Sequence, residues 1–194
     1  MLVASFRDNL GKSSQGGQTL YDHIMACVKV AHRILSDNQF VPEGYRRQKR
    51  DQLLFSVFIH DIGKLDMPSS LFTKRSISER EFEYIRQHPV KGAKLIEPIT
   101  IWRGVVPYVM YHHEAWDGSG YPFGRAGDSI PFLARVINLA EAFSVMRAPN
   151  SYKKQMSLKE AILDIMRLSG KQFDPTVVKV FIGVLEKEMA RKQT

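Results

Sequence analysis

The sequence predicts an all-α fold, and three observations support this prediction. From about residue 19 onward, apolar residues recur at the three- and four-residue spacing of helices, and few stretches alternate with a period of two. Helix-start and helix-stop signals separate these stretches. No internal repeat is evident, and 194 residues are enough for one domain with a core that needs no disulfide. We therefore expect a helical domain at residues 19–194, preceded by a tail or linker at residues 1–18.

The first two helices are predicted from their apolar residues. One face of the first helix carries residues at positions i, i+4, i+7 and i+11, namely His23, Cys27, Val30 and Ile34. The next segment is the nearly all-apolar run 53–59, which leads directly into His60. By pattern alone this run is a buried strand or a buried helix. The polar lead-in at residues 46–52 favours a long buried helix.

Capping signals predict the later helices. S-x-x-E capping boxes at 78–81 and 157–160 each open a helix. The first of these helices is expected to end near His88–Pro89, because a residue before proline avoids the α conformation. The second covers 158–168 and stops at Gly170.

Three further segments complete the set of predicted helices. Asp174 is a helix N-cap, and Pro175 occupies the first position of the final helix. Residues 106–113 and 134–146 also show helical periodicity.

Composition limits the compartment and the partners. A single cysteine, Cys27, excludes an intramolecular disulfide and fits a reducing cytoplasm. No apolar stretch approaches the roughly 20 residues that span a bilayer, and the N-terminus does not resemble a signal peptide. A cytoplasmic protein without a membrane segment is therefore expected. The net charge of +8 favours anionic partners such as phosphorylated small molecules. The basic cluster at 46–50 is interpreted as a solvated helix face, because no aromatic residues or nucleic-acid motif accompany it.

Two histidine motifs point to a metal site. Residues 60–64 are His-Asp-Ile-Gly-Lys, and residues 112–122 are His-His-Glu-Ala-Trp-Asp-Gly-Ser-Gly-Tyr-Pro. Imidazole and carboxylate ligands in this mixture suit iron, manganese or zinc. Of the six histidines, we expect five to converge on one metal centre and His32 to be structural.

Residues 60–64 offer two metal ligands and a cation. Asp61 can bridge two ions while His60 binds one. Lys64 follows His60 by four residues, so on a continuing helix it projects from the same face and could neutralise a phosphoryl oxygen. The alternative is a surface lysine near a turn.

The other candidate ligands are weaker individually. His112 and His113 diverge by about 100° on a helix, which suits two ligands reaching different ions. Glu114 and Asp117 are candidates for orienting the imidazole rings. Glu141 lies among apolar neighbours, where a carboxylate needs a partner, and a metal is a suitable one.

These motifs resemble those of the HD-GYP family, a branch of the HD-domain phosphohydrolases. The similarity runs from about residue 19 to about residue 183. It rests on five segments: His60-Asp61-Ile-Gly-Lys64, His88-Pro89, His112-His113-Glu114, Asp117-Gly-Ser-Gly120-Tyr121-Pro122 and Ile130-Pro131. The resemblance implies an HD-domain helical bundle with a metal centre in its core. It implies two or three divalent ions, commonly iron or manganese, with zinc, nickel and magnesium as alternatives. By position, the family's metal ligands map onto His23, His60, Asp61, His88, His112, His113 and Glu141.

The sequence departs from the family pattern at three places. Glu141 stands where aspartate is usual. Thr19 stands where some members have a glutamate that adds a third ion, so two ions are expected. The family's Asp-x5-Arg-Pro-Tyr-Arg/Lys segment begins here with Ser144 and has Asn150 in place of the arginine, although Lys153 remains.

The resemblance implies hydrolysis of the bacterial messenger cyclic di-GMP, or a related cyclic dinucleotide, to linear pGpG and then GMP. Asp61 and Lys64 are the expected catalytic residues, and Lys64, Tyr121, Asn150 and Lys153 are the expected substrate-binding residues. Because an asparagine amide binds phosphate more weakly than a guanidinium group does, inefficient hydrolysis is expected. The alternatives are a catalytically degenerate signalling module and a phosphohydrolase for another nucleotide. The resemblance also implies contact between the 118–122 loop and diguanylate cyclase (GGDEF) domains. The residues before the connector at 11–18 are interpreted as either a short tail or the remnant of a link to an upstream domain.

Overall fold

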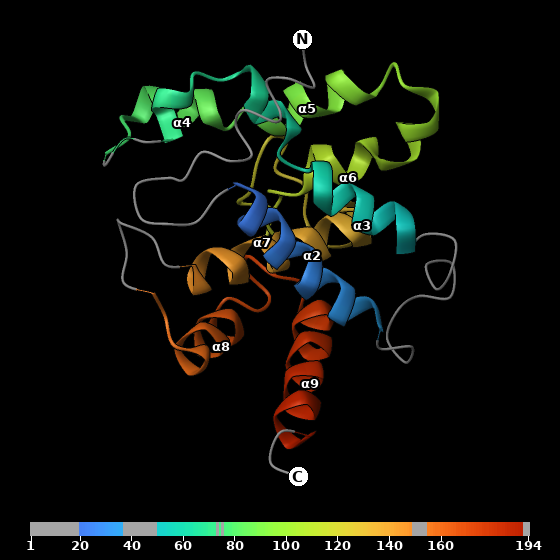
Figure 1. The fold of residues 1–194 in the computed structure, drawn as a ribbon, viewed down its shortest axis with the longest axis vertical. Coiled ribbons are helices and arrows are strands. Elements are labelled where there is room, and N and C mark those ends of the chain that lie inside the picture. Colours follow the sequence, from blue (N-terminus) through green and yellow to red (C-terminus); the bar gives the residue numbers. More distant parts are fainter. Residues whose placement is uncertain (1–19, 37–49, 73, 75, 149–154, 192–194) are drawn as a thin grey trace.

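The computed structural model describes residues 20–36, 50–72, 74, 76–148 and 155–191. In this part of the chain the regular structure is helical, and the β contacts are two isolated bridges (Figure 1). The predicted all-α class is confirmed. The α-helices are α2 (Leu20–Ser36), α3 (Arg50–Ile59), α4 (Glu79–Ile85), α5 (His88–Ile96), α6 (Val106–Tyr111), α7 (Phe132–Arg147), α8 (Leu158–Arg167) and α9 (Pro175–Arg191). Short 3-10 helices are η2 (Ile62–Asp66), η3 (Ser69–Phe72), η4 (Thr100–Val105) and η5 (Gly127–Ser129).

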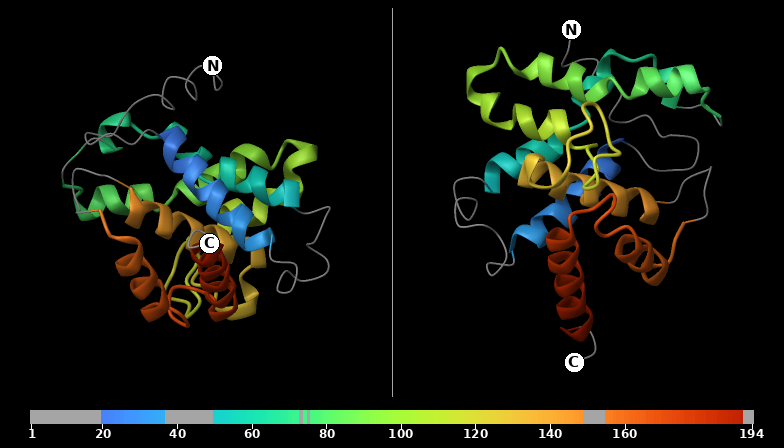
Figure 2. Two further views of the ribbon diagram at one scale, coloured as in Figure 1. Left: turned by 60° about the horizontal axis from the view of Figure 1, so that its bottom comes forward. Right: turned by 180° about the vertical axis from the view of Figure 1, so that it is seen from behind.

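Helix α7 forms the centre of the core. It lies among the other helices (Figures 1 and 2) and contacts α2, α6, α8 and α9. Its buried residues lie on most of its faces. A helix that is apolar nearly all round is expected in such a central position. The predicted apolar face of α2 is also confirmed, because Cys27, Val30 and Ile34 are fully or almost fully buried. Helix α2 packs along α7 and α3, so His23 faces the interior of the bundle.

The predicted capping boxes are both present. Glu81 N donates to Ser78 Oγ, and the Glu81 carboxylate accepts from Ser78 N. Ser157 and Glu160 repeat this arrangement at the start of α8. At the start of α9, Asp174 Oδ1 accepts from Thr176 N, as the predicted N-cap requires.

One predicted helix boundary is shifted. The helix opened by Ser78 ends at Ile85, and a second helix, α5, begins at His88. Pro89 occupies the first turn of α5, where its missing N–H costs no hydrogen bond. The proline therefore starts a helix that the sequence analysis did not predict.

Two glycines bring η2 against α5. A Cβ atom on Gly63 would lie 2.0 Å from the carbonyl oxygen of His88 and 2.6 Å from the backbone nitrogen of Gly92. Real Cβ atoms essentially never approach a neighbour this closely. The glycine of the His-Asp-Ile-Gly-Lys motif therefore allows the 60–64 segment to lie directly on the backbone that carries His88.

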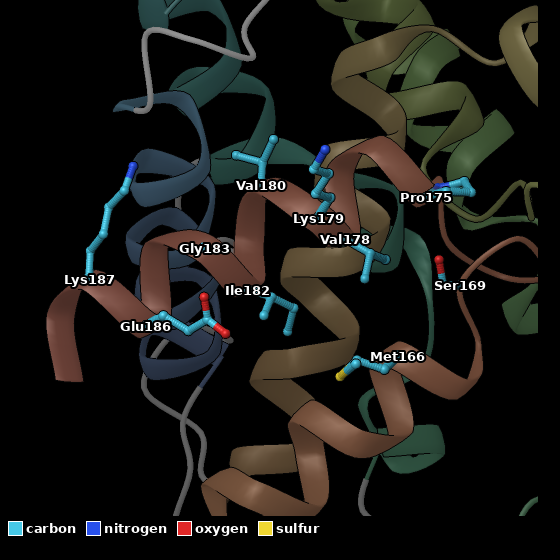
Figure 3. A pocket seen from close by; sticks show the side chains of 10 residues that line it. All are labelled: Met166, Ser169, Pro175, Val178, Lys179, Val180, Ile182, Gly183, Glu186 and Lys187. Carbon is cyan, nitrogen blue, oxygen red and sulfur yellow. The ribbon is translucent and has the colours of Figure 1, made fainter. Parts of the chain in front are cut away.

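Helices α8 and α9 diverge, and α9 projects away from the rest of the fold (Figures 1 and 2). A cavity of about 580 Å³ lies beside them, bordered by Met166, Val178, Ile182 and Glu186 among others (Figure 3). None of the predicted ligands lines it. Among the described helices, none is both long and apolar enough to cross a bilayer. Residues 1–18, predicted as a tail or linker, lie outside the described residues.

Candidate metal centre

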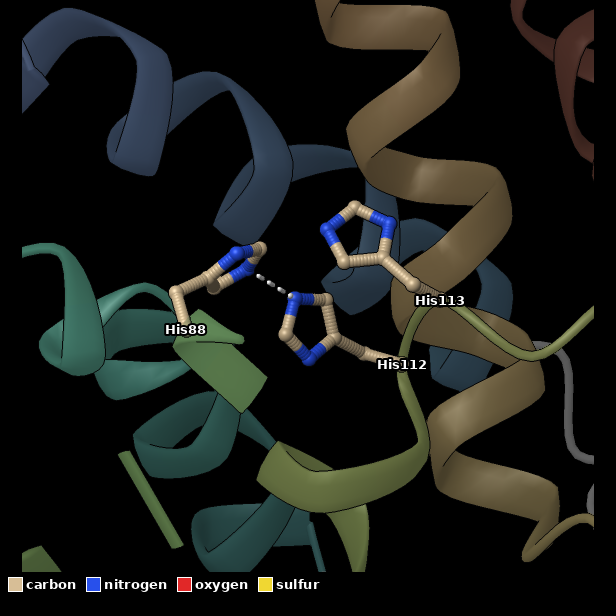
Figure 4. Close-up of side chains that lie close together, drawn as sticks. All are labelled: His88, His112 and His113. Atoms are coloured by element: carbon tan, nitrogen blue, oxygen red, sulfur yellow. Dashed lines mark hydrogen bonds between the residues drawn. The ribbon is translucent and has the colours of Figure 1, made fainter. Parts of the chain in front are cut away.

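The seven predicted ligands form two adjacent groups. His23, His60, Asp61 and Glu141 can each offer one ligand atom such that all four atoms lie within 4.8 Å of one another. The second group is His88, His112 and His113, with the same spacing (Figure 4). The His60 and His112 ring centroids are 5.2 Å apart, so the groups adjoin. His32, predicted to be structural, is exposed on α2 and belongs to neither group.

Three of these histidines lie at helix ends and share one hydrogen-bond pattern. His60 directly follows α3, His112 caps the end of α6, and His88 follows the end of α4. In each case Nδ1 donates to the carbonyl oxygen three residues earlier, at distances of 2.6, 2.6 and 2.8 Å respectively. The last carbonyls of a helix have no partner within the helix, and these rings supply one. Since a carbonyl can only accept, Nδ1 carries the proton, and Nε2 of each neutral ring is left as a metal ligand.

This tautomer makes the second group suitable for a cation. His88 Nε2 and His112 Nε2 lie 3.1 Å apart and point toward each other (Figure 4). With both Nδ1 atoms protonated, two neutral rings would place two lone pairs face to face at this distance, which is repulsive. A bound ion removes the repulsion, because two imidazole nitrogens at about 2.1 Å from one metal lie roughly 3 to 3.4 Å apart. The residues present therefore fit a metal.

Unpaired buried nitrogens support the same conclusion. His60 Nε2 and His113 Nε2 are buried and have no hydrogen-bond partner among the described residues. Buried polar atoms are otherwise almost always paired.

Burial, together with the neighbouring His113 and His88, holds the pKa of His112 well below its usual value. Burial, followed by electrostatic interaction with His88 and Lys64, also holds the pKa of His113 well below its usual value. The rings of His112 and His113 are therefore neutral, as metal ligation requires.

Asp61 connects the two groups. Its Oδ2 lies 3.5 Å from His60 Nε2, and its Oδ1 lies 3.2 Å from His88 Nε2 in a contact too poorly aligned for a hydrogen bond. Burial would raise the pKa of Asp61, but the adjacent Lys64 ammonium and His60 hold it well below its usual value. The buried carboxylate is therefore ionised and has one oxygen toward each group.

Lys64 is placed differently from the predicted orientation. The chain enters η2 after His60, and Lys64 Nζ donates to Asp61 Oδ2 at 2.7 Å. Burial would lower the pKa of Lys64, but the carboxylates of Asp61 and Glu141 raise it, so the side chain is charged. The alternative of an isolated surface lysine is excluded.

Glu141 and Tyr121 border the site. Glu141 Oε2 lies 3.8 Å from His113 Nε2, which makes a second contact between the groups. Burial and the Asp61 carboxylate would raise the pKa of Glu141, but His60 and Lys64 lower it below its usual value. The Tyr121 ring stacks on His113, with centroids 4.7 Å apart and planes inclined by 21°. The predicted substrate residues Asn150 and Lys153 lie outside the described residues, as does Thr19.

The predicted roles of Glu114 and Asp117 as imidazole orienters are wrong. The buried Glu114 carboxylate accepts from the backbone N–H groups of Phe123 and Arg125, at 2.9 and 3.0 Å. Asp117 accepts from the backbone and hydroxyl of Ser119. Both carboxylates therefore fold the loop that carries Tyr121, and helix-end carbonyls orient the imidazole rings instead.

Two supporting residues were missed by the sequence analysis. Asn138 on α7 donates to the carbonyl oxygens of His112 and Glu114, at 2.9 and 3.2 Å. Its signal was a polar residue inside an apolar helix. Ser144, noted only as a departure from the family pattern, places its hydroxyl 3.3 Å from His23 Nδ1.

Comparison with known proteins identifies several relatives. A family model described as "HD domain" matches residues 22–177. A cyclic di-GMP phosphodiesterase of Thermotoga maritima is 36% identical over 141 residues, covering 71% of this chain and 38% of that protein. A 3'3'-cGAMP-specific phosphodiesterase of Vibrio cholerae is 25% identical over 174 residues, covering 88% of this chain and 32% of that protein. The chain thus spans about a third of the length of these relatives. The solved structure of Bd1817, an HDG"Y"P protein of Bdellovibrio bacteriovorus, aligns with a TM-score of 0.67 at 19% identity. That alignment covers 87% of this chain and 53% of the solved one, and it supports the fold.

Proposed function

Because this chain belongs to the HD-domain family, and its motifs are those of the HD-GYP branch, we propose that it is a metal-dependent phosphodiesterase of cyclic dinucleotides. The proposed substrate is cyclic di-GMP or a close relative such as 3'3'-cGAMP, by analogy with the named relatives. The proposed products are the linear dinucleotide and then the mononucleotides. The observation that carries the proposal is the pair of adjacent ligand groups joined by the ionised Asp61.

We further propose that the two groups hold one divalent ion each, iron or manganese. Imidazole nitrogens with a minority of carboxylate oxygens suit these metals, and zinc or nickel accept the same donors. The ligands would be His23, His60, Asp61 and Glu141 for one ion and His88, His112 and His113 for the other, with Asp61 close to both.

When bound, such ions supply Lewis acidity and lower the pKa of an attacking water. The remaining tasks fall to the chain. Lys64 holds the Asp61 carboxylate ionised, and its ammonium group would stabilise the charge that develops on a phosphoryl oxygen. Tyr121 covers His113 and so limits access of water to that ligand.

The direct test is hydrolysis by the full chain after anaerobic loading with iron or manganese. Cyclic di-GMP and 3'3'-cGAMP would be incubated with the loaded protein, and the linear products separated by chromatography. We expect turnover of at least one dinucleotide, and none after chelation. Binding without turnover in the fully loaded protein would contradict the proposal and indicate a signalling module that senses the nucleotide.

Replacing Lys64 by methionine should lower kcat by roughly 10²- to 10³-fold, comparable to losing one oxyanion-hole donor. The substitution keeps the length of the side chain and removes the charge, so metal content measured by elemental analysis should change little. Lys94→Met, on the exposed side of α5, is the matched control. Parallel loss of metal and activity would contradict this role and show that Lys64 acts by stabilising the ligand group.

We also propose that the loop at residues 118–122 is available to a partner such as a diguanylate cyclase domain. Its tyrosine faces His113, but the adjacent Phe123 is 60% exposed. An exposed aromatic side chain at a loop tip is a common anchor for protein contacts. Pull-down of purified GGDEF domains by the wild type and by Phe123→Ser would test this contact.

A further inference from the structure

Cyclic dinucleotides carry two phosphodiester charges, and a metal centre that cuts one of them leaves the other to be held by the protein. The following inference rests on the function proposed above. The expected anchor residue at position 150 is asparagine, which has no charge. Lys64 is engaged with Asp61. Lys153, the other expected substrate-binding cation, lies outside the described residues. Within the described residues, a second phosphodiester therefore needs another cation near the metal centre.

Arg86 is in a suitable position. It caps the end of α4, two residues before His88. Its guanidinium carbon lies 4.7 Å from the centroid of the Tyr121 ring, and the same ring stacks on His113. Tyr121 therefore contacts both Arg86 and a candidate metal ligand.

Most N–H groups of Arg86 are available for a ligand. The guanidinium carbon lies 4.7 Å from the centroid of the Tyr121 ring and 5.9 Å from that of Phe82, distances typical of cation–π contacts. A guanidinium group has five N–H donors, and among the described residues one of them makes a hydrogen bond. Nη1 donates to Glu83 Oε1 at 2.8 Å, and Glu83 is 58% exposed. Such a solvent-exposed pair contributes little free energy, so a phosphate can displace the carboxylate.

Arg125 offers an instructive contrast. Its guanidinium also lies over a tyrosine ring, 4.2 Å from the centroid of Tyr111. However, its Nη1 donates to the carbonyl oxygen of Ser129, and its backbone N–H is bound by Glu114. Arg125 therefore stabilises the conformation of its own loop, whereas Arg86 is restrained by aromatic contacts and by one displaceable carboxylate.

We propose that Arg86 binds the second phosphodiester of the cyclic dinucleotide, with Tyr121 as the aromatic ring that positions its guanidinium group. The planar guanidinium suits a bidentate contact with two phosphate oxygens. Arg86 is thus a substrate-binding residue that compensates for the asparagine at position 150.

Steady-state kinetics of the metal-loaded full chain test this role with four proteins. Arg86→Ala should raise KM for the dinucleotide about 10- to 100-fold, as expected for losing hydrogen bonds to a charged group, and should change kcat much less. Arg167→Ala removes an arginine in an equivalent i,i+3 pair with Asp164 on α8, and should leave KM unchanged. Glu83→Gln removes the competing carboxylate and should lower KM.

A second substrate separates this inference from the proposed function. Bis(p-nitrophenyl) phosphate has one phosphodiester, so its hydrolysis should be equal in wild type and Arg86→Ala, which also shows an intact metal centre. If the wild type cleaves a cyclic dinucleotide and Arg86→Ala has the KM of Arg167→Ala, the role of Arg86 is refuted while the proposed function stands. If the wild type cleaves only the single phosphodiester, the proposed function and the anchor are both refuted.

Discussion

Replacing Asp61 by alanine is expected to reduce the metal content of the protein from about two ions per chain to less than one. Asp61 has one oxygen toward each ligand group, so its loss would remove a carboxylate that is close to both proposed ions. It also leaves the partly buried Lys64 ammonium without its carboxylate partner. Activity should fall by more than roughly 10³-fold, beyond the loss of a single electrostatic donor. Elemental analysis of anaerobically purified protein and a hydrolysis assay on the same sample would measure both effects.

Controls for this prediction lie close by in the sequence. Asp66→Ala, five residues further along η2, removes a carboxylate that is 72% exposed and pairs only loosely with Lys91. His60→Ala and His32→Ala form a second pair, one inside a ligand group and one on the exposed side of α2. The first member of each pair should lose metal, and the second should retain it. Wild-type metal content in Asp61→Ala would refute the assignment of the centre.

Thermal unfolding gives a readout of the same centre that does not depend on activity. A metal that binds only the folded protein stabilises it by about 2.7 kcal/mol when the free metal is 100 times the Kd. Chelation should therefore lower the Tm of the wild type, and the Tm of Asp61→Ala should respond much less.

The sequence was sufficient to predict most of the α-helices, because their signals are local. The capping boxes at Ser78 and Ser157 depend on contacts within four residues, and both formed as predicted. The boundary near His88 was harder, because proline fits the first turn of a new helix as well as it ends an old one. The sequence therefore predicted one helix where the structure has two.

The candidate site was predictable as a set of residues, and its internal arrangement was not. The motifs identified seven candidate ligands, but their division into four and three depends on how α2 packs on α7 and how η2 packs on α5. The orienting groups were misassigned for a similar reason. Carboxylates near histidines are common orienters, but here the helix-end carbonyls are closer, because each of His60, His88 and His112 follows the end of a helix. Tertiary contacts between distant segments decide both points.

The contact between η2 and α5 is also where a single methyl group should have a large effect. In Gly63→Ala the new Cβ would lie 2.0 Å from the His88 carbonyl oxygen and 2.6 Å from Gly92 N, both backbone atoms that cannot rotate away. Either η2 or α5 must move, so we expect the free energy of unfolding to fall by about 3 kcal/mol or more, at the upper end of overpacking effects. Because the movement separates Asp61 from His88, metal content should fall as well.

Urea denaturation of the metal-free proteins would isolate the packing effect from the loss of metal. Gly183→Ala provides a control with the opposite sign, because a Cβ at this position in α9 would meet nothing within 4 Å. Alanine is favoured over glycine within a helix, so this variant should gain about 0.5–1 kcal/mol. If the free energy of unfolding of Gly63→Ala is instead within about 1 kcal/mol of the wild-type value, then η2 and α5 are not in close contact. The placement of Asp61 next to His88, on which the proposed two-ion centre depends, would then be wrong.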